Sequence, residues 1–148
     1  MTKLKFWLIS AIPLAVGGLS SLLAGEKSTD GWATPPLSPP DWLFPIVWII
    51  LYAMIGLASA IAASHEPKAE GLTAFYFGLL LNFSWTIVFF RFELFWACVA
   101  ILSAMIALAV MTAIIFRRKS QVAAWLMLPY ILWLCFALYL NVGIAVMN

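Results

Sequence analysis

The residues of this chain best suited to recognising a ligand are aromatic rings and amides at helical spacing. Trp48 and Tyr52 are four residues apart, so they share one face of a helix. Asn82, Trp85 and Phe89 follow at intervals of three and four residues and form a second stripe. Large flat side chains with few polar atoms are typical of sites for planar, mostly apolar molecules. The spacing therefore fits a site for such a molecule if the stripes of different helices converge.

A third stripe steps by four residues through Pro129, Trp133, Ala137 and Asn141. An amide left unpaired in hydrocarbon costs several kcal/mol, so we expect Asn82 and Asn141 to face the protein interior. If the three stripes converge, they enclose an apolar cavity with a few polar contacts. The same pattern also fits simple packing, because aromatic stripes and interhelical amides often join membrane helices.

Several kinds of chemistry have no residues to support them. No Asp, Glu, Lys, Arg or His lies well inside an apolar segment, whereas ion-coupled transporters usually keep such a group there. The chain shows no Ser, His and Asp set and no glycine-rich phosphate loop, so we do not expect hydrolysis or phosphoryl transfer. Cys98, Cys135 and His65 stand singly, and no metal site is expected.

The composition places the three stripes in a membrane. Hydrophobic residues make up 66% of the 148 residues, charged residues 9%, and the mean hydropathy is +1.06. Soluble domains are about 45–50% apolar and about 25% charged. Because a helix needs roughly 20 residues to cross a bilayer and lipid forces the backbone to bond internally, the long apolar segments should be transmembrane helices.

We predict an all-α membrane protein, a bundle of five transmembrane helices in a single domain over residues 1–148. The predicted spans cover residues 6–25, 42–64, 71–90, 94–116 and 120–146. The connections are too short for a soluble catalytic or nucleic-acid-binding domain, so a net charge of +2 does not indicate nucleic acid as a partner. The lipid bilayer is the expected environment.

The connection over residues 26–41 contains four closely spaced prolines, Pro35, Pro36, Pro39 and Pro40. Proline fixes φ and removes the backbone donor, so this loop cannot form a regular helix. Its position directly before Trp42 suggests an ordered lid at the membrane surface. Four tryptophans near span ends have headgroup anchoring as their simplest interpretation. These are Trp7, Trp42, Trp96 and Trp125.

The basic residues divide unequally between the two sides of a five-span topology. Six are assigned to the side of the N-terminus, namely Lys3, Lys5, Lys68, Arg117, Arg118 and Lys119. Two are assigned to the other side, Lys27 and Arg91. Because cytoplasmic connections carry the excess of Lys and Arg, we predict a cytoplasmic N-terminus, with the first loop and the C-terminus outside.

Three motifs follow one another along the chain. The first comprises Pro35 to Pro40, Trp42, Val47-Trp48 and Leu51-Tyr52. The second comprises Leu81-Asn82, Trp85 and Phe89-Phe90, and the third Pro129-Tyr130, Trp133, Phe136-Ala137 and Leu140-Asn141. In these motifs, and in its length and five spans, the chain resembles a bacterial member of the TspO/MBR family. These are tryptophan-rich membrane receptors related to the mitochondrial translocator protein.

The resemblance implies a five-helix bundle of the bacterial inner membrane, often dimeric, that binds porphyrins such as protoporphyrin IX and requires no cofactor. The implied ligand-binding residues are Trp42, Trp48, Tyr52, Asn82, Trp85, Phe89, Trp96, Trp133, Ala137 and Leu140. Pairs of small residues such as Gly56 and Ala60 offer a face for a homodimer. Cholesterol is a doubtful partner, because no basic residue follows Tyr139.

These observations lead to one leading hypothesis and three alternatives. The leading hypothesis is a membrane receptor or sensor for a tetrapyrrole of the protoporphyrin IX type. The first alternative is light-dependent oxidative degradation of protoporphyrin IX, an unconventional enzymatic activity in which Trp48 and Trp133 would be the catalytic residues. The second is a transporter of porphyrins or other amphipathic molecules, and the third is a structural partner protein.

Overall fold

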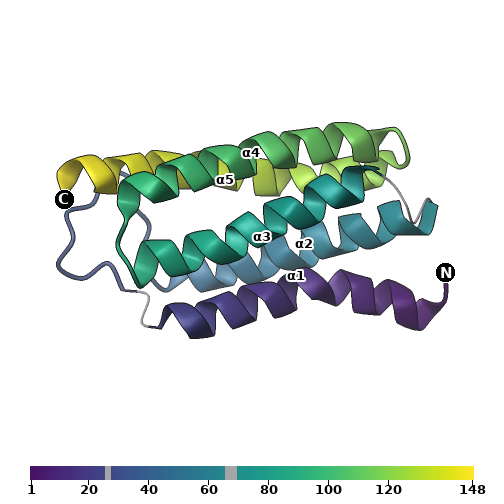
Figure 1. The fold of residues 1–148 in the computed structure, drawn as a ribbon, viewed down its shortest axis with the longest axis horizontal. Coiled ribbons are helices and arrows are strands. Elements are labelled where there is room, and N and C mark those ends of the chain that lie inside the picture. Colours follow the sequence, from purple (N-terminus) through teal and green to yellow (C-terminus); the bar gives the residue numbers. More distant parts are fainter. Residues whose placement is uncertain (26–27, 66–69) are drawn as a thin grey trace.

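The computed structural model describes residues 1–25, 28–65 and 70–148. It contains five helices, and each is long and apolar enough to cross a membrane (Figure 1). Their bounds are α1 Lys3–Ala24, α2 Leu43–His65, α3 Glu70–Phe90, α4 Phe95–Arg117 and α5 Gln121–Met147. The predicted bundle of five transmembrane helices is thereby confirmed, and no predicted boundary differs from the observed one by more than three residues.

Local sequence signals explain several of the helix ends. The hydroxyl of Thr2 accepts a hydrogen bond from the Lys5 amide at 3.2 Å, and the hydroxyl of Ser120 caps α5 by accepting from Ala123 at 3.3 Å. Such N-caps satisfy amides that have no partner within the helix. Helix α1 ends at Ala24 and is followed by Gly25, whose φ of 77° lies in a region that glycine tolerates best.

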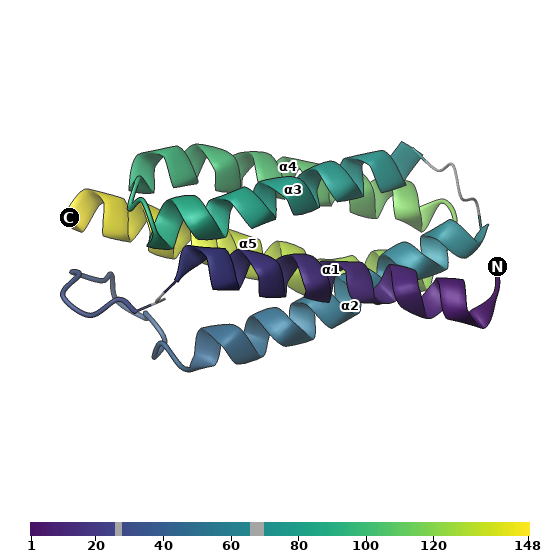
Figure 2. The same cartoon turned by 60° about the horizontal axis from the view of Figure 1, so that its bottom comes forward.

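Helix α1 packs against α2 and α3. Helix α4 packs against α3 and α5, and α5 also packs against α2. Helices α1 and α2 approach most closely where Gly56 lies against the backbone carbonyl of Ser10 and the ring of Pro13. A side chain at Gly56 would collide with that carbonyl. Towards the end of the bundle that carries residues 28–42 the two helices separate (Figure 2).

The small-residue faces considered for a dimer are used inside the chain. Gly56 packs on α1 and Ala60 has an exposed fraction of 0%. On α3, a Cβ at Gly78 would lie 3.5 Å from Leu108 of α4. These residues bring neighbouring helices together within one protein chain. The homodimer stays a prediction, and its interface would have to use other residues.

The two ends of the bundle differ in charge. The N-terminus and the turn between α4 and α5 lie at one end, while residues 28–42, the turn between α3 and α4, and the C-terminus lie at the other (Figure 1). The arrangement places Lys3, Lys5 and the run from Arg117 to Lys119 at the first end. Arg91 lies at the second end. Lys27 and Lys68, which also entered the predicted topology, lie outside the described residues.

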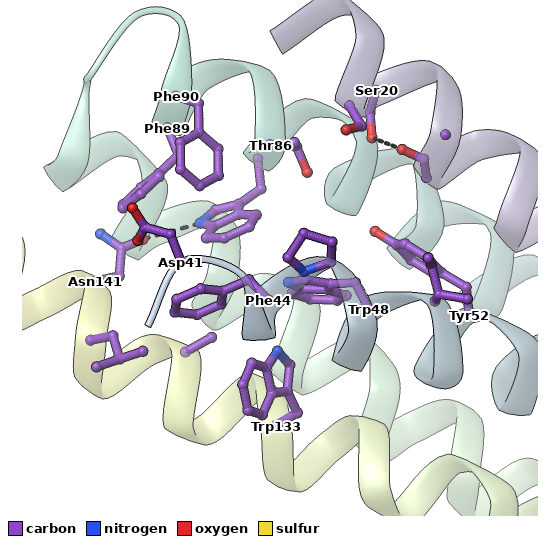
Figure 3. Close-up of a pocket in the computed structure, with 18 of the residues that line it drawn as sticks. Ser20, Asp41, Phe44, Trp48, Tyr52, Thr86, Phe89, Phe90, Trp133 and Asn141 are labelled. Atoms are coloured by element: carbon purple, nitrogen blue, oxygen red, sulfur yellow. Dashed lines mark hydrogen bonds between the residues drawn. The ribbon is translucent and has the colours of Figure 1, made fainter. Parts of the chain in front are cut away.

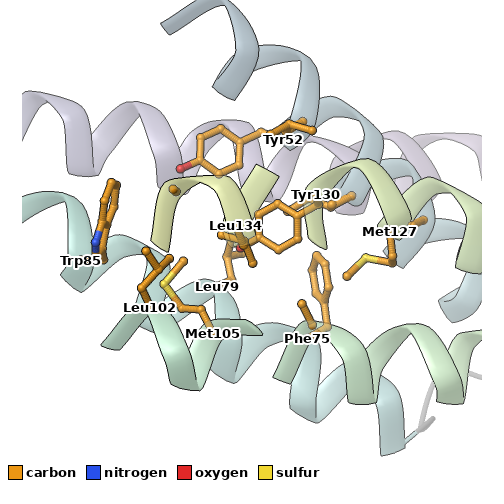
Figure 4. Packing of buried hydrophobic residues seen from close by; sticks show 14 of the residues in the cluster. Tyr52, Phe75, Leu79, Trp85, Leu102, Met105, Met127, Tyr130 and Leu134 are labelled. Atoms are coloured by element: carbon orange, nitrogen blue, oxygen red, sulfur yellow. The ribbon is translucent and has the colours of Figure 1, made fainter. Parts of the chain in front are cut away.

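A tightly packed hydrophobic core joins α2, α3, α4 and α5. Ile55, Leu102, Met105, Met127 and Leu134 each have an exposed fraction of 1% or less (Figure 4). Interior packing of this density leaves little space for a ligand. The cavity described below lies elsewhere, between α1, α2, α3 and α5.

Candidate ligand-binding cavity

The described part of the chain encloses a cavity of about 290 Å³ beneath the proline-rich loop. Its walls come from α1, α2, α3, α5 and the loop residues Thr29 and Asp41, whereas α4 supplies none of the described lining residues. Aromatic rings dominate the walls, and a few hydroxyl, amide and carboxylate groups interrupt them (Figure 3). This is the usual make-up of a site for a largely apolar small molecule.

Seven of the ten residues predicted to bind a ligand lie in the cavity wall. They are Trp48, Tyr52, Trp85, Phe89, Trp133, Ala137 and Leu140. Asn82 lies behind the wall, and its side chain is 1% exposed. Trp42 and Trp96 are not brought to the cavity, since they are 66% and 59% exposed near the ends of α2 and α4. An outward ring at a helix end is the arrangement expected of a headgroup anchor.

Trp48 is the central ring of the cavity. Its ring stacks on Tyr52 with centroids 5.4 Å apart, and it lies 6.1 Å from the ring of Trp85. The ring of Trp133 stands nearly perpendicular to it at 6.4 Å. Trp85 in turn stacks on Phe89 at 5.2 Å. Aromatic pairs at these separations attract each other, so the walls form one connected aromatic surface drawn from three helices.

A buried hydrogen-bond chain supports this surface from behind. The hydroxyl of Tyr52 donates to Oδ1 of Asn82 at 2.7 Å, and Nδ2 of Asn82 donates to the hydroxyl of Tyr130 at 3.0 Å. The three residues belong to α2, α3 and α5. Because all three are buried, these bonds replace contacts that water would otherwise supply. Asn82 therefore positions the wall instead of facing the cavity.

Two tryptophans of the wall differ in how their ring nitrogens are satisfied. Nε1 of Trp85 donates to Oδ1 of Asn141 at 3.1 Å, and Nδ2 of Asn141 donates to the carbonyl of Phe95 at 3.0 Å. Nε1 of Trp133 is buried and has no hydrogen-bond partner among the described residues. In the close-up this nitrogen lies on the side of the ring that faces Trp48 (Figure 3). A buried unpaired donor costs about 1–3 kcal/mol, which an acceptor on a ligand would recover.

The loop over the cavity is held by contacts at several points. Trp32 packs its ring against Phe89, Phe90 and Phe95, with centroid distances of 5.6, 6.3 and 5.0 Å. The side chain of Asn148 accepts a hydrogen bond from the Ala33 amide at 3.1 Å and donates to the Ala33 carbonyl at 2.8 Å. These contacts fix Trp32 and Ala33 of the loop against α3, α4 and the end of α5.

Further contacts tie the prolines of this loop to α5. The hydroxyl of Tyr139 donates to the carbonyl of Pro36 at 2.7 Å. The ring of Pro35 lies so close to Gly143 that a Cβ on this glycine would come within 2.5 Å of it. Glycine is required here because the loop and the helix backbone approach each other directly. The C-terminal part of α5 is therefore the support on which the loop rests.

The contribution of α1 and of the loop carboxylate was missing from the sequence prediction. Gly17 and Ser20 of α1 line the cavity, together with Asp41 and Phe44. Helix α1 carries no aromatic stripe that would have marked it. The one signal is Gly17, since a Cβ there would collide with the ring of Tyr52. The absence of a side chain at Gly17 therefore leaves room for the Tyr52 ring in the cavity wall.

Comparison with known proteins places the chain in a family. The model of the TspO/MBR family matches residues 9–147. The chain belongs to the TspO/MBR family. It is 35% identical over 142 residues to a tryptophan-rich protein TspO from Chlorobaculum tepidum, with 91% of this chain and 90% of the relative covered.

Two further relatives of this TspO/MBR chain show the range of names within the family. A tryptophan-rich sensory protein from Cereibacter sphaeroides is 30% identical over 82% of this chain and 77% of its own length. A translocator protein from Ovis aries is 34% identical over 72% of this chain and 66% of its own length. Together with the five apolar helices, this membership identifies an integral membrane protein of the sensor and translocator type.

The buried chain through Asn82 makes a prediction about stability. Asn82→Leu removes both hydrogen bonds and leaves the Tyr52 hydroxyl without its acceptor, so the variant should lose about 1–3 kcal/mol of unfolding free energy. Unfolding followed in detergent measures this loss. Ser84→Ala on the same helix is the matched control and should change little, because its hydroxyl bonds only to its own helix, at Leu80.

A double-mutant cycle separates the hydrogen bond from simple loss of volume. Removing both partners of a buried bond costs less than removing one, because no orphaned polar group remains. The combination of Tyr52→Phe with Asn82→Leu should therefore cost less than the sum of the two single variants. Strict additivity of the two losses would show that this hydrogen bond does not support the wall.

Proposed function

We propose that this protein is a membrane receptor or sensor that binds a tetrapyrrole of the protoporphyrin IX type in the cavity beneath its loop. The observation that carries the proposal is the set of three tryptophans, Trp48, Trp85 and Trp133, that meet around one cavity from three helices. Flat aromatic walls suit a flat aromatic ligand, since each ring contact adds about 0.5–1.5 kcal/mol beyond simple burial.

Two further features of the cavity support a planar ligand with polar atoms. The unpartnered Nε1 of Trp133 supplies a donor for an acceptor atom of the ligand. The volume of about 290 Å³ lies just below the usual range for small-molecule sites, which is roughly 300–1,000 Å³. A macrocycle would therefore fill the cavity and extend beyond it. We propose that it does so beside the lining residues Thr29 and Asp41, at the loop end of the cavity, which we call its mouth.

Titration of the detergent-purified protein with protoporphyrin IX in the dark tests this proposal. The Soret band should shift with saturable, low-micromolar affinity. The combined variant Trp48→Phe and Trp133→Phe should raise the dissociation constant by about tenfold, equivalent to about 1.4 kcal/mol. Trp125→Phe is the control, because Trp125 is 61% exposed and does not line the cavity. Unchanged affinity in the double variant would remove these residues from the site.

A second candidate function is light-dependent oxidative degradation of the bound porphyrin. The observation that favours it is the direct contact of Trp48 and Trp133, whose ring centroids are 6.4 Å apart in the cavity wall. Both indoles would touch a bound macrocycle, at a distance where they can exchange electrons with its excited state. Molecular oxygen would be the oxidant.

Illumination of the porphyrin complex in air distinguishes this activity from simple photobleaching. The expected result is a discrete open-chain product that forms with the protein and is strongly reduced in the Trp48→Phe, Trp133→Phe variant. Trp125→Phe should leave the product unchanged. Equal bleaching with and without protein, or an undiminished product in the double variant, would rule the activity out.

We propose that the mouth of the cavity faces away from the cytoplasm in a bacterial inner membrane. Lys3, Lys5, Arg117 and Arg118 gather at the opposite end of the bundle, and cytoplasmic ends carry such an excess.

Labelling of single cysteines tests this orientation. In a protein without Cys98 and Cys135, an impermeant maleimide applied to intact cells should label Leu37→Cys in the exposed loop. It should label Gln121→Cys, at the other end of the bundle, only after the membrane is permeabilised. The reverse pattern would invert the topology.

A further inference from the structure

The described part of the cavity wall contains one acidic side chain. Among the described lining residues this is the carboxylate of Asp41, and no Lys, Arg or His accompanies it. From this arrangement we infer that Asp41 makes the cavity selective for ligand charge. It admits planar molecules whose end at the mouth is neutral or cationic, and disfavours those that place a carboxylate there. This inference rests on the proposed binding of a planar ligand in the cavity.

The carboxylate is held in a fixed position. Oδ2 of Asp41 accepts a hydrogen bond from the Thr29 amide at 3.1 Å, and Oδ1 accepts from the Thr29 hydroxyl at 2.8 Å. Each carboxylate oxygen can accept a second bond, so the group retains capacity for a ligand donor after both contacts with Thr29 are made. Asp41 shares the wall with Phe44 and Asn141, which places its charge against the aromatic part of the cavity (Figure 3).

No cation in the described wall offsets this charge. Arg91 lies at the same end of the bundle, but it is exposed and its guanidinium donates to the carbonyl of Leu23 at 2.9 Å, and it is not a lining residue. The faces of the surrounding indole rings also carry negative potential, which favours cations. A ligand carboxylate at the mouth would therefore meet like charge in an environment that screens it less than bulk water does.

A purely structural role of Asp41 predicts a different outcome. If the carboxylate only fastens Thr29 and the loop, its loss should change the affinity for every ligand by a similar factor. If its charge faces the ligand, its loss should change the preference between ligands that differ only in charge. The ratio of two dissociation constants therefore separates the two roles.

Protoporphyrin IX and its dimethyl ester are a suitable pair, because they share one macrocycle and differ in the ionised propionates. Both are titrated in the dark against the wild-type protein, Asp41→Asn, Asp30→Asn and Thr29→Val. The Asp41→Asn variant should improve binding of the free acid relative to the ester by about tenfold, the scale of one like-charge contact that solvent largely screens. Asp30 is exposed and does not line the cavity, so Asp30→Asn should leave the ratio unchanged while removing the same charge from the same loop.

Thr29→Val weakens the contact with the loop but keeps the Asp41 charge. It should therefore move both dissociation constants together and leave their ratio constant. A second measurement needs no variant: raising the salt concentration should improve binding of the free acid relative to the ester in the wild-type protein, since salt screens a repulsion near the mouth.

The outcomes are distinct. A ratio that is the same in wild type and Asp41→Asn, and insensitive to salt, would overturn the charge selectivity while leaving the proposed function intact. Saturable binding of neither compound to the wild-type protein would remove the proposed function, and the charge selectivity with it.

Discussion

The geometry of the cavity depends on one amide that joins three helices. Asn82 accepts from Tyr52 and donates to Tyr130, and both contacts are buried. In an apolar interior each of these groups needs a partner, so the three helices have one favourable register relative to one another. Tyr52 then supports Trp48 by ring stacking, and the face of α3 that carries Asn82 also carries Trp85. The position of the aromatic walls follows from this single arrangement.

The bundle divides its helices between support and recognition. Helix α4 packs on α3 and α5, and contributes fully buried residues such as Leu102 and Met105, but no described lining residue. Helix α1 does the opposite, because it lies against the α2 backbone at Gly56 and lines the cavity further along with small residues such as Gly17. One side of the molecule is therefore densely packed, and the other leaves the space that a ligand needs.

Much of this organisation could be predicted from the sequence because membrane helices have a strong and local signal. Length and hydropathy gave the five spans, and the cost of burying an amide correctly predicted that Asn82 and Asn141 face inward. Helical periodicity also identified the stripes of Trp48, Trp85 and Trp133 that meet in the wall.

Other features have no local signal. Helix α1 lines the cavity with small residues such as Gly17, and helical periodicity does not reveal a wall position that lacks a side chain. The family resemblance implied that Trp42 and Trp96 bind the ligand, but both lie at helix ends, where the rings turn outward. The hydrogen bond between Ala33 and Asn148 joins residues 115 positions apart, and no sequence pattern in either segment predicts it. Such contacts depend on the completed bundle, so the structure was required to see them.

The two hydrogen bonds between Asn148 and Ala33 have a practical consequence for work with this protein. A polypeptide appended after Asn148 would begin beside the cover of the cavity, at the residue whose side chain bonds to the loop backbone in both directions. An affinity tag or fluorescent fusion at that end would therefore lie next to the loop over the cavity whose ligand binding an assay measures. The opposite end of the bundle, near Thr2, is remote from the cavity and is the better place for such an attachment.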